Sequence, residues 1–208
     1  MGTAAPTDER LMRDFVRGDR AGFELLVHRH SGELFRFVYR MTRDSAATEE
    51  LVQEVFLQVS VSAARFDPDR PFKPWLYTIA ANKTRDWLRS QRRRRKELPL
   101  GSEMNDDLGG FRFRSVLAQE VKHPSHGLQA AESRRLVREI VECLRPDWRE
   151  ILVLAYFHRF EYRQIAEIIG IPLGTVKSRL HAAVASFAEA YRAATDPSKH
   201  SARAQDTD

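Results

Sequence analysis

The chain has 208 residues, of which 42% are hydrophobic and 30% charged, and its net charge at pH 7 is +5. This composition is too apolar for a disordered chain and too charged for a membrane protein, and no apolar run approaches the ~20 residues of a membrane-spanning helix. The single cysteine, Cys143, excludes an intrachain disulfide and a metal site of several thiolates. We therefore expect a soluble cytoplasmic protein in which Cys143 is a small buried side chain.

Apolar residues recur at spacings of three and four along most of the chain, and two-residue alternation is scarce, so helices are predicted throughout. A short helix ends at Gly18-Asp19, and a longer one follows it to Met41. Thr48 is a plausible N-cap for a third helix. A connection with three prolines, residues 65–74, then leads to a fourth helix over residues 75–96.

Positive charge is concentrated in one segment. Residues 68–96 contain 10 Lys and Arg against 2 Asp and Glu, a net charge of +8 that exceeds the +5 of the whole chain. Such a concentration favours a polyanionic partner. The basic run at residues 92–96, taken alone, is equally well explained as the solvated end of a helix.

The periodicity is lost over residues 97–130, where glycines and acidic residues predict a flexible linker. Helices return over residues 131–192 before a polar tail at 193–208. In this second helical stretch four side chains are expected to face inward: Leu152, Val153, Tyr156 and Phe157. The predicted fold class is all-α, with two small helical domains (8–96 and 131–192) joined by a flexible linker.

Residues 162–181 have the pattern of a helix-turn-helix. A short amphipathic helix ends at Gly170, which can adopt the left-handed conformation that terminates helices. A second helix is expected to begin with Thr175 as its N-cap. Its inner stripe is predicted to be Val176, Leu180, Val184 and Phe187. The first-turn side chains that can reach base edges in a major groove are Thr175, Lys177, Ser178, Arg179 and His181, although an ordinary helical hairpin would show a similar pattern.

The stretch from Ile165 to Leu180 closely resembles the promoter-binding helix-turn-helix of extracytoplasmic-function (ECF) sigma factors, the small two-domain sigma subunits of bacterial RNA polymerase. The resemblance implies that residues 131–192 are a region 4-like domain that contacts the minus-thirty-five promoter element. Two features depart from the family pattern. Ala182 and Val184 replace the usual arginines after His181, and Glu161 replaces the usual Ser cap of the first helix.

The N-terminal helices resemble the same family independently. Residues 48–57 are similar to the family helix that docks on the clamp helices of the polymerase's largest subunit, and the resemblance implies a polymerase-binding set of Glu50, Leu51, Gln53, Glu54 and Phe56. The polar members of this set share one helix face, which without the resemblance would be assigned to ordinary solvated surface. Ser60 stands where the family usually has a large aromatic residue, so a looser local core is expected there.

Residues 72–89 resemble the family segment that recognises and melts the minus-ten element. The amide of Asn82 can contact base edges, while basic side chains hold phosphates. An unstacked base also needs an aromatic surface, for which Phe66 and Tyr77 are further candidates, although core packing is the expected role of Tyr77. The implied minus-ten set is Phe72, Trp75, Asn82, Lys83, Arg85 and Arg89.

Taken together, the resemblance implies a sigma factor and not an enzyme, with a region 2-like domain at 8–96 and no cofactor or metal. The implied partners are the RNA polymerase core, promoter DNA and an anti-sigma protein, with no insertion into a membrane. A helix-turn-helix regulator acting without polymerase would explain 131–192 but not the upstream basic module. A metal-dependent hydrolase is disfavoured because the seven histidines form no ligand motif. The linker either threads toward the polymerase active-site cleft or is a soluble spacer.

Overall fold

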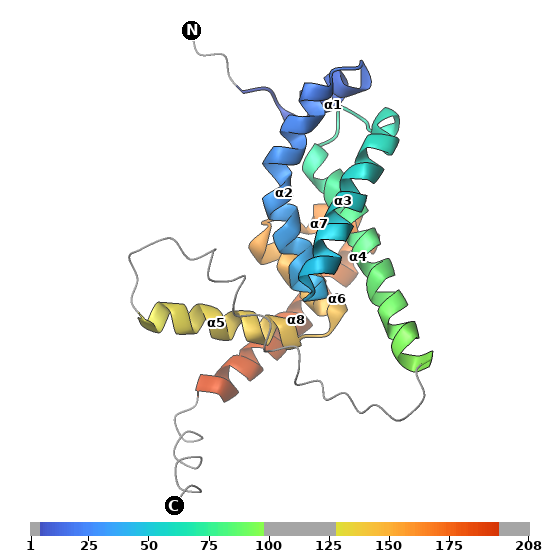
Figure 1. The fold of residues 1–208 in the computed structure, drawn as a ribbon. Coiled ribbons are helices and arrows are strands. Elements are labelled where there is room, and N and C mark those ends of the chain that lie inside the picture. The colour runs from blue at the N-terminus through green and yellow to red at the C-terminus, as the bar shows by residue number, and fades with distance from the viewer. Residues whose placement is uncertain (1–4, 98–127, 196–208) are drawn as a thin grey trace, which may run out of the picture. The chain divides into compact units, whose positions relative to one another are not determined.

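In a computed structural model, the residues described are 5–97 and 128–195, and every regular element in these ranges is helical (Figure 1). This confirms the all-α fold class. The elements are α1 (Asp8–Val16), α2 (Arg20–Thr42), α3 (Ser45–Ser62), η1 (Ala63–Arg65), α4 (Phe72–Glu97), α5 (Leu128–Cys143), α6 (Pro146–Leu152), η5 (Val153–Phe157), α7 (Tyr162–Ile169) and α8 (Leu173–Thr195).

The described residues divide into two compact units. One unit comprises 5–97 together with 153–176, and the other comprises 128–152 together with 177–195. Apart from its ends, the predicted linker lies outside the described residues, as does most of the predicted tail.

Side-chain caps define where the first three helices begin. Thr7 accepts a hydrogen bond from the Arg10 amide at 3.3 Å, and Asp19 accepts one from the Ala21 amide at 3.0 Å. Asp44 caps α3 through the Ala47 amide at 3.1 Å, so the prediction that Thr48 is the cap was wrong. Aspartate is as good a cap as threonine, and it lies one turn earlier in the chain.

The core of the first unit lies between α1, α2, α3 and α4, in which α2 and α4 each contact the other three helices. Its largest fully buried side chains include Met12, Leu26, Leu34, Phe37, Phe72, Leu76 and Tyr77. The core role expected of Tyr77 is therefore confirmed. α4 begins at Phe72, three residues before its predicted start, because a proline is tolerated in the first helical turn, where Pro74 lies.

Two segments of the first unit come from much later in the chain. α7 packs against α4, and the π-helical turn η5 contacts α2. This π turn shifts the register of the side chains that follow, because it holds more residues per turn than an α-helix. Tyr156 and Phe157 are consequently exposed (59% and 37%), so the prediction that both face inward was wrong, whereas Leu152 and Val153 are buried as expected.

In the second unit, Arg149 of α6 donates hydrogen bonds to the carbonyls of Leu144, at 3.0 Å, and Glu142, near the carboxyl end of α5. Cys143, the last residue of α5, is exposed, so its predicted burial was wrong. Burial was expected because free cysteines are usually buried, but here the residue lies at the end of its helix, between the buried Val141 and Leu144.

The helix α8 also differs in detail from the prediction. It begins at Leu173, so Thr175 lies inside its first turn and is not its N-cap. Along its inner stripe Val176, Leu180 and Ala183 are buried, whereas Val184 is exposed. The expected stripe was therefore wrong by one residue at this position.

Candidate nucleic-acid interface

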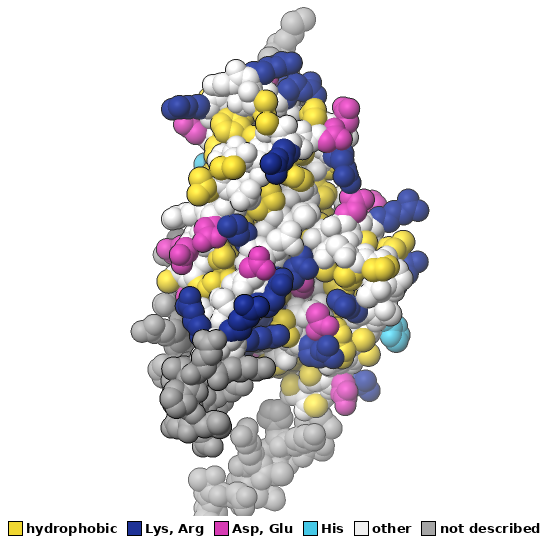
Figure 2. Space-filling model, turned by 90° about the vertical axis from the view of Figure 1, so that its right-hand side faces the viewer, with side chains coloured by type: hydrophobic (Ala, Val, Ile, Leu, Met, Phe, Trp, Pro, Cys, Tyr) yellow, Lys and Arg dark blue, Asp and Glu magenta, His cyan; other side chains and the backbone are white. Residues whose placement is uncertain are grey.

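The basic residues of α4 form a group on the molecular surface. Asn82, Arg89 and the three arginines 92–94 are all exposed. Figure 2 shows a face on which Lys and Arg side chains gather. Arg89 forms an ion pair with Asp86 at 3.1 Å, but with both side chains more than 60% exposed this pair is weak and easily exchanged for a phosphate.

Arg85 is already bonded to protein oxygens. Its guanidinium donates to the side-chain oxygen of Asn82 at 2.8 Å and to the Ile169 carbonyl at 3.0 Å. The structure thus joins two residues of the predicted minus-ten set to each other and to α7. Their position on one face of α4 followed from helical spacing, but the Ile169 carbonyl lies 84 residues further along the chain.

Lys83 and Glu54 lie together, although the sequence assigned them to different partners. The Lys83 ammonium donates to the Glu54 carboxylate at 2.9 Å, joining α4 to α3. Both side chains keep about a third or more of their surface exposed (34% and 44%), so solvent screens the pair. The predicted polymerase-binding and DNA-binding surfaces therefore meet at this ion pair.

The candidate aromatic surface at the start of α4 is a cluster of three rings. Phe66, Phe72 and Trp75 have centroid separations of 5.0–5.9 Å. Phe72 is fully buried and Phe66 is nearly so, whereas Trp75 is half-buried. Of the three, Trp75 alone presents appreciable surface, and its ring packs against both Phe66, 5.0 Å away, and Phe72, 5.9 Å away.

On α3 the predicted polymerase-binding residues are split between surface and core. Glu50 and Gln53 are exposed and Glu54 is half-buried, whereas Leu51 and Phe56 are buried. Two residues that sequence reasoning missed, Leu57 and Val61, are 65% and 73% exposed. They continue the stripe of Gln53 at intervals of four, which helical spacing alone could have revealed.

The first helix of the helix-turn-helix segment ends at the glycine predicted from the sequence. Gly170 has φ of 75° and ends α7, with its amide bonded to the Ala166 carbonyl at 2.9 Å. At the start of α7, the side chain of Gln164 accepts a hydrogen bond from the Glu161 amide at 3.0 Å. This contact compensates in part for the replaced Ser cap.

The predicted minus-thirty-five residues lie at the start of α8. Of these, Lys177, Ser178 and His181 are exposed, and Thr175 and Arg179 are half-buried.

A buried polar contact joins α4 to the segment between η5 and α7. The Tyr77 hydroxyl and His158 Nδ1 share a hydrogen bond of 2.8 Å, and the two rings lie 5.0 Å apart. Burial, together with the nearby Arg40 charge, lowers the pKa of His158 to about 4, while Glu33 opposes the shift. Burial also raises the pKa of Tyr77. Both groups are therefore uncharged at neutral pH.

Across the described ranges, no group of three or more His, Cys, Asp or Glu side chains is arranged to hold a metal ion. In the same ranges, no helix combines the length and the apolar character needed to cross a bilayer.

Family profiles match both helical stretches. The profile of Sigma-70 region 2 matches residues 26–94, and that of Sigma-70, region 4 matches residues 134–186. The first match contains the basic face of α4 and the exposed stripe of α3, and the second contains the helix-turn-helix.

Similar proteins cover most of the chain. The ECF RNA polymerase sigma-E factor of Escherichia coli K12 is 32% identical over 175 residues, covering 84% of this chain and 88% of that protein. The ECF RNA polymerase sigma factor SigW of Bacillus subtilis is 28% identical over 173 residues, covering 83% and 90%. Among solved structures, the sigma factor RpoE of Bartonella quintana, in complex with the anti-sigma factor NepR, gives a TM-score of 0.62 at 24% identity, over 84% of this chain and 98% of that one. This structural likeness supports the fold.

Proposed function

The chain belongs to the extracytoplasmic-function (ECF) RNA polymerase sigma factors, and on that premise we propose which of its residues carry out each step of promoter recognition. As a sigma factor it directs the polymerase core to specific promoters and initiates transcription there. The observation that carries this conclusion is the match of two separate stretches to regions 2 and 4 of one family. A regulator acting without polymerase would account for the second match alone.

Polymerase docking is assigned to the exposed stripe of α3. Glu50 and Gln53 are accessible to basic helices of a partner, and the exposed Leu57 extends the stripe with apolar surface. The buried Leu51 and Phe56 support this helix from its inner face. In this proposal, the chain acts by binding and has no enzymatic step.

Recognition and melting of the minus-ten element are assigned to α4, within a region 2-like domain at 8–96. Asn82 and Arg89 are exposed for contact with base edges and phosphates. Lys83 and Arg85 also contact phosphates in this proposal, once DNA replaces the Glu54 carboxylate and the Ile169 carbonyl that they bind in this structure. Trp75 presents the surface on which an unstacked base can rest, and Phe72 holds that ring from below.

Contact with the minus-thirty-five element is assigned to α8, within a region 4-like domain at 131–192. The exposed Lys177, Ser178 and His181 lie in its first turns, with Thr175 and Arg179 beside them. We also infer an anti-sigma partner, since the similar sigma factor of Bartonella quintana is bound to one. Residues 97–130 connect the two domains as a linker.

The decisive experiment is transcription from genomic DNA by purified polymerase core with and without this protein, with the start sites sequenced. New start sites that share minus-ten and minus-thirty-five elements are the expected result. A protein that binds DNA but gives no new start sites would support the regulator instead.

The docking assignment has its own test. Glu50→Arg together with Gln53→Ala reverses the charge of the exposed stripe and should abolish association with the core. Because neither residue is buried, the free energy of unfolding should change by no more than ~0.5 kcal/mol. The matched control is Glu24→Arg, at an exposed residue of α2. Co-purification of the double variant at wild-type yield would rule out this docking surface.

A further inference from the structure

The first turn of α4 lacks a cap from its own segment. The residue before the helix is Pro71, whose side chain has no hydrogen-bonding atom, and Pro74 has no amide hydrogen. The Phe72 amide is one of the donors that a helix start leaves without a partner inside the helix. It donates instead to the carboxylate of Glu9, 3.0 Å away on α1. A residue 63 positions earlier thus provides the cap.

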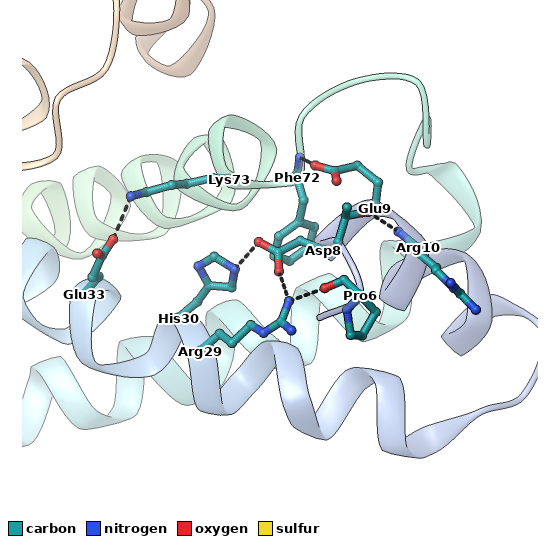
Figure 3. Close-up of polar contacts among 10 residues, drawn as sticks. Pro6, Asp8, Glu9, Arg10, Arg29, His30, Glu33, Phe72 and Lys73 are labelled. Carbon is teal, nitrogen blue, oxygen red and sulfur yellow. Dashed lines mark hydrogen bonds and ion pairs between the residues drawn. The ribbon is translucent and has the colours of Figure 1, made fainter. Parts of the chain in front are cut away.

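The helix that carries Glu9 is held firmly on α2 (Figure 3). Asp8 accepts a hydrogen bond from the Arg29 guanidinium at 2.9 Å, and its other oxygen lies 2.7 Å from His30 Nε2. Arg29 also donates to the Pro6 carbonyl at 2.7 Å. These contacts, only partly open to solvent, fix the start of α1 and therefore the position of Glu9.

The residue that Glu9 caps supports the candidate melting surface. The Phe72 ring lies 5.9 Å from Trp75 and 5.3 Å from His30. The adjacent Lys73 forms an ion pair with Glu33 of α2 at 2.7 Å, which also lowers the pKa of Glu33. The start of α4 is therefore attached to α1 and α2 at two successive residues, and displacement of the Phe72 backbone would move one of the two rings that Trp75 packs against.

We propose that Glu9 is a positioning residue for promoter melting, holding the first turn of α4 so that Trp75 can accept an unstacked base. This inference rests on the proposed function of α4. Glu9 itself contacts no DNA in this scheme. It acts by satisfying the Phe72 amide and by placing negative charge at the positive end of the α4 dipole.

The test compares three substitutions at this position in the holoenzyme. Glu9→Ala removes the acceptor and should lower open-complex formation on a duplex promoter about fivefold, the change in an equilibrium that corresponds to the ~1 kcal/mol of stability typically lost with a helix cap. Glu9→Gln keeps an acceptor oxygen and should restore opening to within about twofold of wild type. Glu9→Asp keeps the charge, but its side chain is one methylene shorter and cannot reach the Phe72 amide as well. If Glu9→Ala does not fold, Glu9→Asp takes its place, and opening should again be lower than in wild type and in Glu9→Gln. The control is Glu24→Ala, at an exposed carboxylate of α2.

Opening is followed by 2-aminopurine fluorescence in the minus-ten element, and core affinity is measured on the same preparations. The expected result is impaired opening with unchanged core affinity and rescue by glutamine. Unimpaired opening in Glu9→Ala would overturn the proposal, as would parallel losses of opening and core affinity, which indicate a general folding role. If wild-type holoenzyme opened no promoter, the proposed function itself would fail.

Discussion

His158 is a weak base that the fold keeps neutral. It is 9% exposed, shares a hydrogen bond with Tyr77, and is surrounded by Arg36, Arg40 and Lys73, with Glu33 as the opposing charge. Burial lowers its pKa to about 4 in the folded chain, whereas an unfolded chain has an ordinary histidine pKa near ~6.5. As the pH falls from ~6.5 toward 4, the unfolded chain therefore binds a proton that the folded chain excludes.

We accordingly predict that acid destabilises the wild-type chain more than a His158→Gln variant. The stability that neutral His158 contributes is fully present above ~pH 6.5 and declines below it, by about 2 kcal/mol between pH 7.5 and 5. Urea unfolding at these two pH values measures the difference. His181→Gln, at an exposed residue of α8, is the control and should follow the wild type. Identical acid sensitivity in wild type and His158→Gln would contradict the prediction.

Sequence spacing correctly located side chains on helix faces but did not identify their partners. The resemblance gave Lys83 and Arg85 as phosphate-binding residues of α4, and the structure has them on different sides of that helix, against α3 and α7. It could not show that they bind Glu54 and the Ile169 carbonyl, because these oxygens come from other helices. The Glu9 cap was missed for the same reason, although the absence of an acceptor at Pro71 was a visible signal.

At the scale of helices, α1 and α2 approach closely at one point. A Cβ atom on Gly22 would lie 2.9 Å from the Leu11 carbonyl oxygen, a backbone atom that can yield only if α1 moves. Gly32, further along α2, is different. A Cβ there would lie 3.6 Å from the end of the flexible Arg36 side chain, which is ordinary contact.

The same substitution should therefore have opposite effects at these two glycines. Gly22→Ala is expected to lower the free energy of unfolding by about 1–3 kcal/mol through overpacking. Gly32→Ala should raise it by about 0.5–1 kcal/mol, because alanine loses less backbone entropy in a helix. Chemical denaturation of the two variants provides the measurement. A gain in stability for both would mean that α1 shifts freely on α2.

Most helices could be predicted because their apolar spacing extends over several turns, as in α2 and α4. The errors fall where a local feature interrupts the spacing. The π turn η5 displaced Tyr156 and Phe157 to the surface, and the end of α5 exposed Cys143. The π turn has no strong signal in the sequence, because it depends on how the surrounding helices pack, whereas Pro146 does mark the end of α5.

At the scale of the whole molecule, positive charge has two expected roles on promoter DNA. The exposed arginines 92–94 of α4 are too repetitive to specify sequence, whereas Lys177 and Arg179 lie in the first turns of α8. Each lost phosphate contact should reduce the slope of log affinity against log salt by ~0.9. A lost base contact should weaken binding by about 1–3 kcal/mol on the cognate element and little elsewhere.

We predict that alanine at Arg92, Arg93 and Arg94 weakens holoenzyme binding to all promoters alike and flattens its salt dependence. Lys177→Ala or Arg179→Ala should instead relax specificity at one or two positions of the minus-thirty-five element. Promoter affinity across a salt series, on native and scrambled upstream elements, separates the two effects. Equal losses on both templates for the α8 variants would show that this helix does not recognise bases.

The hydrogen bond from Arg85 to the Ile169 carbonyl also sets up a competition. A promoter phosphate that takes the hydrogen now donated to that carbonyl must displace the carbonyl, although the guanidinium carries five N–H donors in all. Losing the bond to the carbonyl reduces the binding free energy that this Arg85–phosphate contact contributes by about 0.5–1.5 kcal/mol, the usual net contribution of a hydrogen bond. By thermodynamic linkage, DNA held through this same hydrogen loosens the end of α7 to the extent that α7 weakens this contact with DNA.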